Sequence, residues 1–350
     1  MLIRSPNGTY EAIDFRETAP QAAFEDMYKN NEQASLTGGL ASGVPGELRG
    51  LQYLHENYGK LSWADVLAPG AKLAREGWLV NEDLVKYMKS ATNNVPESNT
   101  TNFLVHDPQW AMDFAPKGRL LKINETITRK RYAATIETIA QHGPDAFYTG
   151  PIADATIRAL RAKNGTMTMD DLKNYTIARR PAASITYGDF KLSSVPAPSS
   201  GNVMLAVLKT MSGYAAHEAG VNTTTHRLDE AMRFAYGQRS KLGDPSFVEG
   251  LDTFQEQMLS DETAAEIRGK ISDTKAYEVP YYQPEGLESL DTPGTSHIST
   301  ADKDGLAVSL TTTVNLLFGS KLVVPETGVI MNNEMNVSSS LFAHFLLPTL

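Results

Sequence analysis

Alternation of polar and apolar positions late in the chain predicts a β-hairpin. Residues 295–300 alternate with the period of a strand, residues 301–305 (Ala-Asp-Lys-Asp-Gly) carry a turn signal, and residues 306–315 form a second β-rich run. A two-residue turn at Asp304-Gly305 would put Thr295 opposite Val314, whereas a loop one residue longer on the first arm would put Thr295 opposite Thr313. Either register leaves Thr313 and Asn315 within one or two pairing positions of Thr295.

Apolar residues three or four positions apart predict a mainly helical scaffold in the middle of the chain. Residues 47–58 are expected to form one helix. After a capping-box pattern at residues 62–65, we expect Pro69 to break the next run and a further helix, begun near Gly70, to end at Gly77. A later stripe, capped at Thr224 or Thr225, is expected to face the core through Leu228, Ala231, Met232, Ala235 and Tyr236.

Composition excludes several classes of protein. The chain has 350 residues, 41% hydrophobic and 21% charged, which suffices for one large or two medium domains. A net charge of -9 without a basic stripe argues against a nucleic-acid partner. The longest apolar stretches, including residues 341–350, fall short of the roughly 18 to 20 residues of a membrane span. The absence of cysteine excludes disulfides, thiolate catalysis and zinc-thiolate sites.

Glycosylation sequons, Asn-x-Ser/Thr, are more frequent than chance placement, roughly two or three, would give. They lie at Asn7, Asn99, Asn124, Asn164, Asn174, Asn222 and Asn336. This pattern favours a secretory history. Residues 1–7, however, lack the apolar segment of a signal peptide, and a missing N-terminal segment would reconcile the two observations.

Thr295 has the sequence setting of a self-released nucleophile. Gly294 precedes it, and a glycine lets a hydroxyl approach the preceding carbonyl without meeting a Cβ. Cutting the Gly294–Thr295 bond would free an α-amine with a reference pKa near ~8, a built-in base beside the hydroxyl. On the hairpin alone, the simpler interpretation is that threonine is a good β-former.

Seven blocks of sequence, in order along the chain, resemble one known family. They are residues 13–20 (IDFRETAP), 38–50 (GGLASGVPGELRG), 147–150 (FYTG), 196–201 (PAPSSG), 226–245, 294–299 (GTSHIS), and 315–320 (NLLFGS) leading to 332–335 (NNEM). In these blocks the chain resembles the γ-glutamyltransferases (γ-glutamyltranspeptidases, glutathione hydrolases) of the N-terminal-nucleophile hydrolase superfamily. The resemblance runs almost end to end.

The resemblance implies an α+β fold, the four-layer αββα sandwich of that superfamily, incomplete in this chain. Residues 1–294 would be the large-subunit portion, and residues 295–350 the start of a small subunit. It implies γ-glutamyl transfer or hydrolysis on glutathione and related γ-glutamyl compounds after self-cleavage at Gly294–Thr295. A γ-glutamyl ester of Thr295 would be resolved by water or by an acceptor amino acid or peptide. Neither a metal nor an organic cofactor is implied.

The resemblance also assigns site residues. Arg16 would grip the substrate α-carboxylate with its guanidinium fork. Asn315 and Glu334 would hold the α-amine and α-carboxylate of the γ-glutamyl group. Thr313 would bond the nucleophile, Thr295, and hold its rotamer.

Two histidines are interpreted as structural, because the freed α-amine already supplies a base. They are His297, two residues past the nucleophile, and His226.

The chain departs from the family pattern in three ways. Val337 stands where the family has a second acidic residue that binds the substrate amine. The sequence stops at Leu350, where the family continues with a paired-serine substrate motif and the Gly-Gly donors of the oxyanion hole. The segment before Ile13 lacks the family's glycine-rich strand and helix. We therefore expect a sequence truncated at both ends, which in full-length form would be extracellular or membrane-associated.

Two alternatives remain open. The departures favour a non-catalytic fragment of this family. A cephalosporin acylase-like amidase shares the superfamily, but relatives of that kind generally use serine as the nucleophile, so Thr295 together with Arg16 argues against it.

Overall fold

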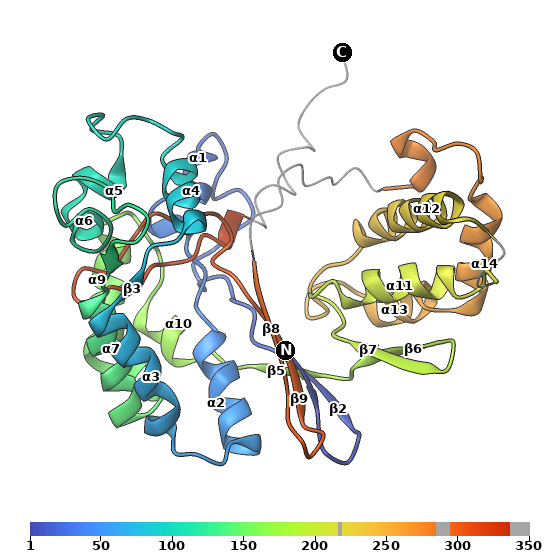
Figure 1. The fold of residues 1–350 in the computed structure, drawn as a ribbon, viewed down its shortest axis with the longest axis horizontal. Helices are drawn as coiled ribbons and strands as arrows, with labels where there is room; N and C mark the ends of the chain where they lie inside the picture. The colour runs from blue at the N-terminus through green and yellow to red at the C-terminus, as the bar shows by residue number, and fades with distance from the viewer. Residues whose placement is uncertain (216–218, 285–294, 337–350) are drawn as a thin grey trace. The chain divides into compact units, whose positions relative to one another are not determined.

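The computed structural model describes residues 1–215, 219–284 and 295–336 (Figure 1). The chain divides into two compact units. Unit 1 comprises Met1–Asp14, Ala178–Asp291 and His297–Thr311, and unit 2 comprises Phe15–Ile177, Thr292–Ser296 and Thr312–Leu350. The described residues combine helices with antiparallel strands, an α+β fold as the sequence predicted. The four-layer arrangement and the division into large- and small-subunit portions stay predictions.

Unit 1 is built on a five-stranded sheet with the strand order β5-β2-β1-β9-β8. Its strands are β1 (Leu2–Arg4), β2 (Tyr10–Asp14), β5 (Ala178–Arg180), β8 (Ser296–Ala301) and β9 (Ala307–Thr312). Strand β1 pairs antiparallel with β2, Leu2 opposite Ala12, and with β9, Ile3 opposite Val308. The sheet therefore joins the first residues of the chain to the hairpin that follows Thr295.

The remainder of unit 1 is a helical layer with a small hairpin. The hairpin consists of β6 (Ala183–Tyr187) and β7 (Phe190–Ser194), and the helices are α11 (Gly201–Met211), α12 (Val221–Arg239), α13 (Leu251–Met258), α14 (Asp261–Lys270) and the 3-10 helix η2 (Val279–Tyr282). A hydrophobic cluster that includes Val203, Val207 and Met258 joins α11, α12 and α13.

Helix α12 differs from the prediction in its start and in its buried face. It begins at Val221, before the expected caps at Thr224 or Thr225. Ala231 and Ala235 are buried, whereas the larger members of the stripe, Leu228, Met232 and Tyr236, are 38%, 44% and 57% exposed. Because α12 packs closely against α11, small side chains fill the contact and larger ones lie beside it.

Unit 2 is mainly helical. Its helices are α1 (Gln33–Leu36), α2 (Glu47–Tyr58), α3 (Trp63–Glu76), α4 (Glu82–Ala91), α5 (Phe103–His106), α6 (Pro108–Phe114), α7 (Lys130–His142), α8 (Asp145–Tyr148), α9 (Gly150–Arg161) and α10 (Met169–Lys173), with the 3-10 helix η1 (Gly39–Ala41). Two short strands, β3 (Trp78–Leu79) and β4 (Thr126–Ile127), pair with each other.

Helix α3 runs through Pro69, so the predicted break there was wrong. The Ser62 side chain caps its first turn as expected, and Gly77 follows its last residue. Proline removes one helical hydrogen bond, which costs about 3 kcal/mol in an isolated helix. Packing along α7 offsets this cost, since Trp63 Nε1 donates to the Ile139 carbonyl at 3.1 Å and Arg75 pairs with Glu137.

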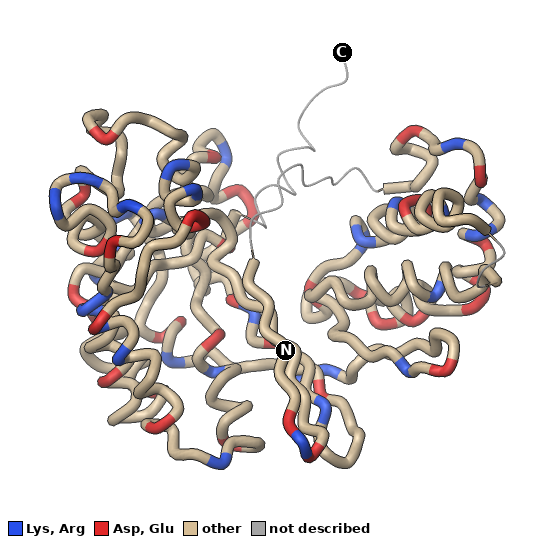
Figure 2. The backbone as a smooth tube through the Cα atoms, viewed as in Figure 1, with Lys and Arg blue, Asp and Glu red and all other residues tan. Residues whose placement is uncertain are grey.

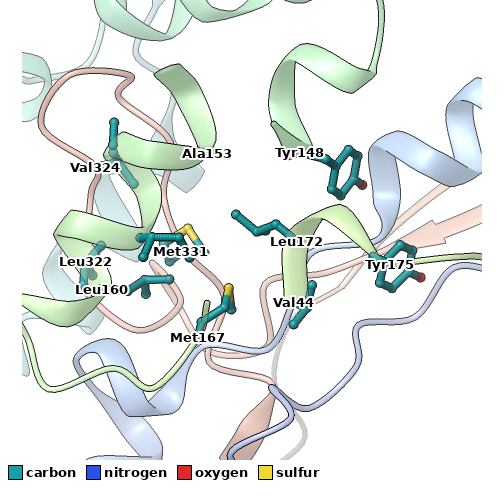
Figure 3. Close-up of a cluster of buried hydrophobic side chains, with 12 residues drawn as sticks. Val44, Tyr148, Ala153, Leu160, Met167, Leu172, Tyr175, Leu322, Val324 and Met331 are labelled. Carbon is teal, nitrogen blue, oxygen red and sulfur yellow. The ribbon is translucent and has the colours of Figure 1, made fainter. Parts of the chain in front are cut away.

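A short antiparallel ribbon, residues 320–331, runs through the core of unit 2. Its rungs are Ser320 N to Met331 O, 3.0 Å, Met331 N to Leu322 O, 3.0 Å, and Val324 N to Val329 O, 2.8 Å. Leu322, Val324 and Met331 join one hydrophobic cluster, with Tyr148, Leu160 and Leu172 (Figure 3), whereas Val323 joins a second cluster with Trp110 and Phe114. The 320–331 ribbon is thus packed on both faces.

Candidate functional site

The β8–β9 hairpin takes the longer-loop register of the two that the sequence allowed. Asp302 N donates to Leu306 O at 2.9 Å, which closes a loop of three residues, 303–305. In this register His297 lies opposite Thr311, and His297 Nδ1 is 2.8 Å from Thr311 Oγ1. Continued by two more pairs, one beyond the ends of the strands, this register puts Thr295 opposite Thr313.

Thr295 immediately precedes β8 and is exposed. The residue before it, Gly294, and the departure at Val337 lie outside the described residues. Three hydroxyl-bearing partners surround the neighbouring His297, whose Nε2 lies 3.0 Å from Ser309 Oγ and 3.3 Å from Ser299 Oγ. The nucleophile candidate therefore stands at the end of a strand rich in hydroxyl groups.

Asn315 is buried and oriented by backbone and side-chain contacts. Its N–H donates to Thr313 Oγ1 at 2.8 Å, and its Nδ2 donates to the Asn333 carbonyl at 3.0 Å. Its φ of 68° is in the left-handed region, which asparagine tolerates better than most residues. Thr313 and Asn315 are thereby brought together beside the segment that carries Glu334.

Glu334 is a buried carboxylate with one satisfied and one unsatisfied oxygen. Its Oε2 lies 3.5 Å from Arg16 Nη2, while its Oε1 is buried and accepts no hydrogen bond from the described residues. Burial raises the pKa of the Glu334 carboxyl, and the Arg16 guanidinium opposes that shift. A buried acceptor without a donor is costly, so this oxygen suits a ligand that brings an N–H donor.

The Arg16 side chain contacts the buried Glu334 carboxylate and is itself partly exposed to solvent. Its side chain is 39% exposed, against 3% for Glu334, and its Nε lies 3.3 Å from Glu17 Oε1. The Arg16 carbonyl accepts a hydrogen bond from the Tyr175 hydroxyl at 2.7 Å. Gly46, before α2, makes room for this contact, because a Cβ there would lie 2.0 Å from that hydroxyl.

Two asparagines that sequence reasoning did not single out hold the site together. Asn332 Oδ1 accepts from Gly43 N at 2.9 Å and from Glu334 N at 3.1 Å. Asn333, which is fully buried, accepts from Leu316 N through its Oδ1 at 2.9 Å. The signal that could have found them is a pair of amides in a segment otherwise buried among apolar residues.

Within the described ranges, no cluster of three or more His, Cys, Asp or Glu side chains could hold a metal ion. In the same ranges no helix is both long enough and apolar enough to cross a bilayer.

Comparison with known proteins gives consistent matches over almost the whole chain. A family model described as gamma-glutamyltranspeptidase matches residues 1–344. A glutathione hydrolase proenzyme of Arthroderma benhamiae is 58% identical over 339 residues, which are 96% of this chain and 57% of that protein. A glutathione hydrolase of Aspergillus flavus is 47% identical over 338 residues, 96% of this chain and 56% of that protein. The chain thus spans little more than half the length of these relatives.

Solved structures show the same relationship. The Helicobacter pylori gamma-glutamyltranspeptidase is 25% identical with a TM-score of 0.70, over 83% of this chain and 82% of that one. A cephalosporin acylase from Bacillus halodurans is 30% identical with a TM-score of 0.78, over 96% of this chain and 60% of that one.

Proposed function

The chain belongs to the gamma-glutamyltranspeptidase family, an enzyme family with relatives named glutathione hydrolase, and we propose that it acts on γ-glutamyl compounds such as glutathione. Its nucleophile is Thr295, released by self-cleavage of the Gly294–Thr295 bond. Water or an acceptor amino acid or peptide then takes the γ-glutamyl group.

The observation that carries this proposal is the Arg16–Glu334 pair. A γ-glutamyl group ends in a carbon that bears both an ammonium and a carboxylate. Arg16 offers a guanidinium fork that matches the carboxylate, and the unsatisfied Oε1 of Glu334 suits the ammonium. Because the two side chains are 3.5 Å apart, both charges of one zwitterion can be met at once.

The chemistry proceeds in two stages, self-cleavage and then γ-glutamyl transfer. In self-cleavage, Thr295 Oγ attacks the Gly294 carbonyl, the peptide bond breaks as an ester forms, and water hydrolyses that ester to leave a free Thr295 α-amine. That amine then accepts the Thr295 hydroxyl proton as Oγ attacks the γ-carbonyl of the substrate. The leaving amine departs protonated, and the γ-glutamyl ester passes to water or an acceptor. Thr313 would hold the Thr295 hydroxyl in position.

Self-cleavage would yield a large subunit, residues 1–294, and a small subunit that begins at Thr295. The name proenzyme, given to the Arthroderma relative, supports such processing. A secretory location is supported by the exposure of six sequon asparagines, Asn7, Asn99, Asn124, Asn164, Asn174 and Asn222. The seventh, Asn336, is half-buried and accepts a hydrogen bond from Ser35 Oγ at 2.9 Å.

A cephalosporin acylase-like amidase is the second candidate, because the acylase structure aligns with 96% of this chain. An amidase whose substrate lacks an α-amino-acid end has no use for the Arg16–Glu334 pair. Ligand preference therefore separates the two candidates.

The test compares three ligands on the Thr295→Ala chain by calorimetry. L-glutamate carries both charges, γ-aminobutyrate lacks the α-carboxylate, and glutarate lacks the α-amine. We expect L-glutamate to bind at least tenfold more tightly than either, since each lost charge-assisted contact is worth roughly 1.5–3 kcal/mol. Glu334→Gln should abolish the preference over glutarate, and Arg16→Gln the preference over γ-aminobutyrate. Equal binding of all three ligands would reject the proposal and favour the amidase.

A further inference from the structure

The tip of the 320–331 ribbon is held by the first turns of α7. Arg131 Nη1 donates to the Pro325 carbonyl at 2.8 Å, and Thr135 Oγ1 donates to the Thr327 carbonyl at 2.9 Å in a buried contact. Arg129 Nη2 donates to the Gly328 carbonyl. Three of the carbonyls at the tip are thus satisfied from a single helix and the residue before it.

These side chains are themselves fixed. Arg131 also donates to Gln109, to Oε1 at 2.8 Å and to the carbonyl at 2.6 Å. The buried Asp113 carboxylate lies 3.6 Å from Arg129 Nε and 3.5 Å from Arg131 Nη2. Gly328 sits so close to α7 that a Cβ would lie 2.9 Å from Tyr132 N. The tip therefore has little freedom to move relative to α7.

The base of the same ribbon carries the substrate-binding candidates. Its last rung is made by Met331, Asn332 bonds the Glu334 N–H at 3.1 Å, and Glu334 follows three residues after the rung. The ribbon is hydrogen-bonded from end to end and packed on both faces, so a displacement of the tip must displace the base.

We propose that Thr135 and Arg131 are positioning residues for Glu334: by fixing the ribbon tip they set where the Glu334 carboxylate meets the ammonium of a γ-glutamyl ligand. This inference rests on the proposed function for the identity of the ligand. The positioning itself is a property of the ribbon and can be measured without a ligand.

The test uses Thr135→Val in the Thr295→Ala chain, because it removes the hydroxyl donor while nearly keeping the side-chain shape. Thr138→Val is the matched control. Both hydroxyls donate within α7, Thr138 to the Ala134 carbonyl at 2.8 Å and Thr135 to the Arg131 carbonyl at 3.3 Å, but of the two only Thr135 also donates to the ribbon. We expect Thr135→Val to weaken L-glutamate about fivefold and glutarate not at all, and Arg131→Lys to do the same. Thr138→Val should change neither.

A double-mutant cycle separates positioning from general loosening. In a Glu334→Gln background, Thr135→Val should have no further effect on L-glutamate, because its effect acts through that carboxylate. Equal weakening of both ligands, or a full additional loss in the Glu334→Gln background, would overturn the inference.

Hydrogen exchange tests, without any ligand, whether Thr135 fixes the segment that leads to Glu334. Peptides that cover residues 331–335 should exchange faster in Thr135→Val than in Thr138→Val. Unchanged exchange overturns the anchor. If the Thr295→Ala chain without further substitutions binds neither L-glutamate nor glutarate, the proposed function fails. Faster exchange at residues 331–335 in Thr135→Val would still support the inference that Thr135 fixes the ribbon.

Discussion

At the scale of single residues, Glu334 combines burial with a nearby opposite charge, and burial has the larger effect on its pKa. Its pKa in the folded chain is raised, so between the ordinary glutamate pKa and the folded value the folded state binds more protons at this carboxyl than the unfolded state does. Stability is therefore lost as pH rises from the ordinary glutamate pKa through the folded value.

It follows that Glu334→Gln should raise the melting temperature at pH 7 relative to the parent chain. The gain should vanish below about pH 4, where the carboxyl is protonated in both states. Thermal melts at several pH values measure the difference. A variant less stable than the parent at pH 7 would show that the Arg16 contact outweighs burial.

Arg16 should act on recognition more than on chemistry. In a family-length form that turns over, Arg16→Lys keeps the charge but loses the bidentate fork, so KM for γ-glutamyl-p-nitroanilide should rise roughly tenfold while kcat changes little. Arg233→Lys is the control, because Arg233 forms an exposed ion pair with Asp229 of its own helix, α12, and contacts neither the 320–331 ribbon nor the site residues among the described residues. An unaltered KM in the Arg16 variant would make Arg16 a surface residue.

The sequence predicts the proximity of some site residues but not of others. Period-two alternation brought Thr295, Thr313 and Asn315 close together without any knowledge of the fold, because strand pairing is local. Arg16 and Glu334 are far apart in the chain, and only the family resemblance linked them. The contacts of Asn332 and Asn333 depend on which backbone groups become buried, which no local pattern encodes.

At the scale of elements, helix α3 tests how packing overrides local propensity. Pro69→Ala restores a backbone donor and removes the clash of the proline ring, so the free energy of unfolding should rise by about 1–3 kcal/mol. Gly70→Ala, where a Cβ meets nothing within 4 Å, should add up to about 1 kcal/mol from propensity alone. Urea titration measures both. Destabilisation by Pro69→Ala, with Gly70→Ala stabilising, would mean that the proline ring packs favourably.

Helix α12 shows that the spacing of apolar residues predicts a helix but not which of those residues are buried. The stripe identified a helix and the side that holds Ala231 and Ala235, but not which members of the stripe are covered. That depends on the size of the side chains at the closest approach to α11, a tertiary property.

At the scale of the whole molecule, processing is the decisive prediction. We expect the folded chain to yield two polypeptides, the smaller beginning at Thr295, and Thr295→Ala to remain intact. Ser296→Ala, a hydroxyl loss at the next residue, should still be cut, because the attacking group is retained. Intact mass and N-terminal sequencing provide the measurement. A small fragment with any other first residue contradicts the assignment of Thr295.

At this scale the family and the α+β class followed from sequence, since seven ordered blocks and the mixed periodicities extend along most of the chain. The division into two units did not, because each unit is assembled from segments distant in sequence, such as residues 1–14 and 297–311 in unit 1. Which strands share a sheet depends on those long-range pairings.

If the chain is cut at Thr295, the 3.5 Å contact between Arg16 and Glu334 would join two separate polypeptides. One polypeptide would carry Thr295, Thr313, Asn315 and Glu334, and the other would carry Arg16. The nucleophile and the arginine that binds the ligand carboxylate would then no longer be covalently connected. A γ-glutamyl ligand that contacts both Arg16 and Glu334 would therefore stabilise the association of the two polypeptides. By thermodynamic reciprocity, whatever the ligand adds to the association of the two polypeptides, their association adds to its affinity.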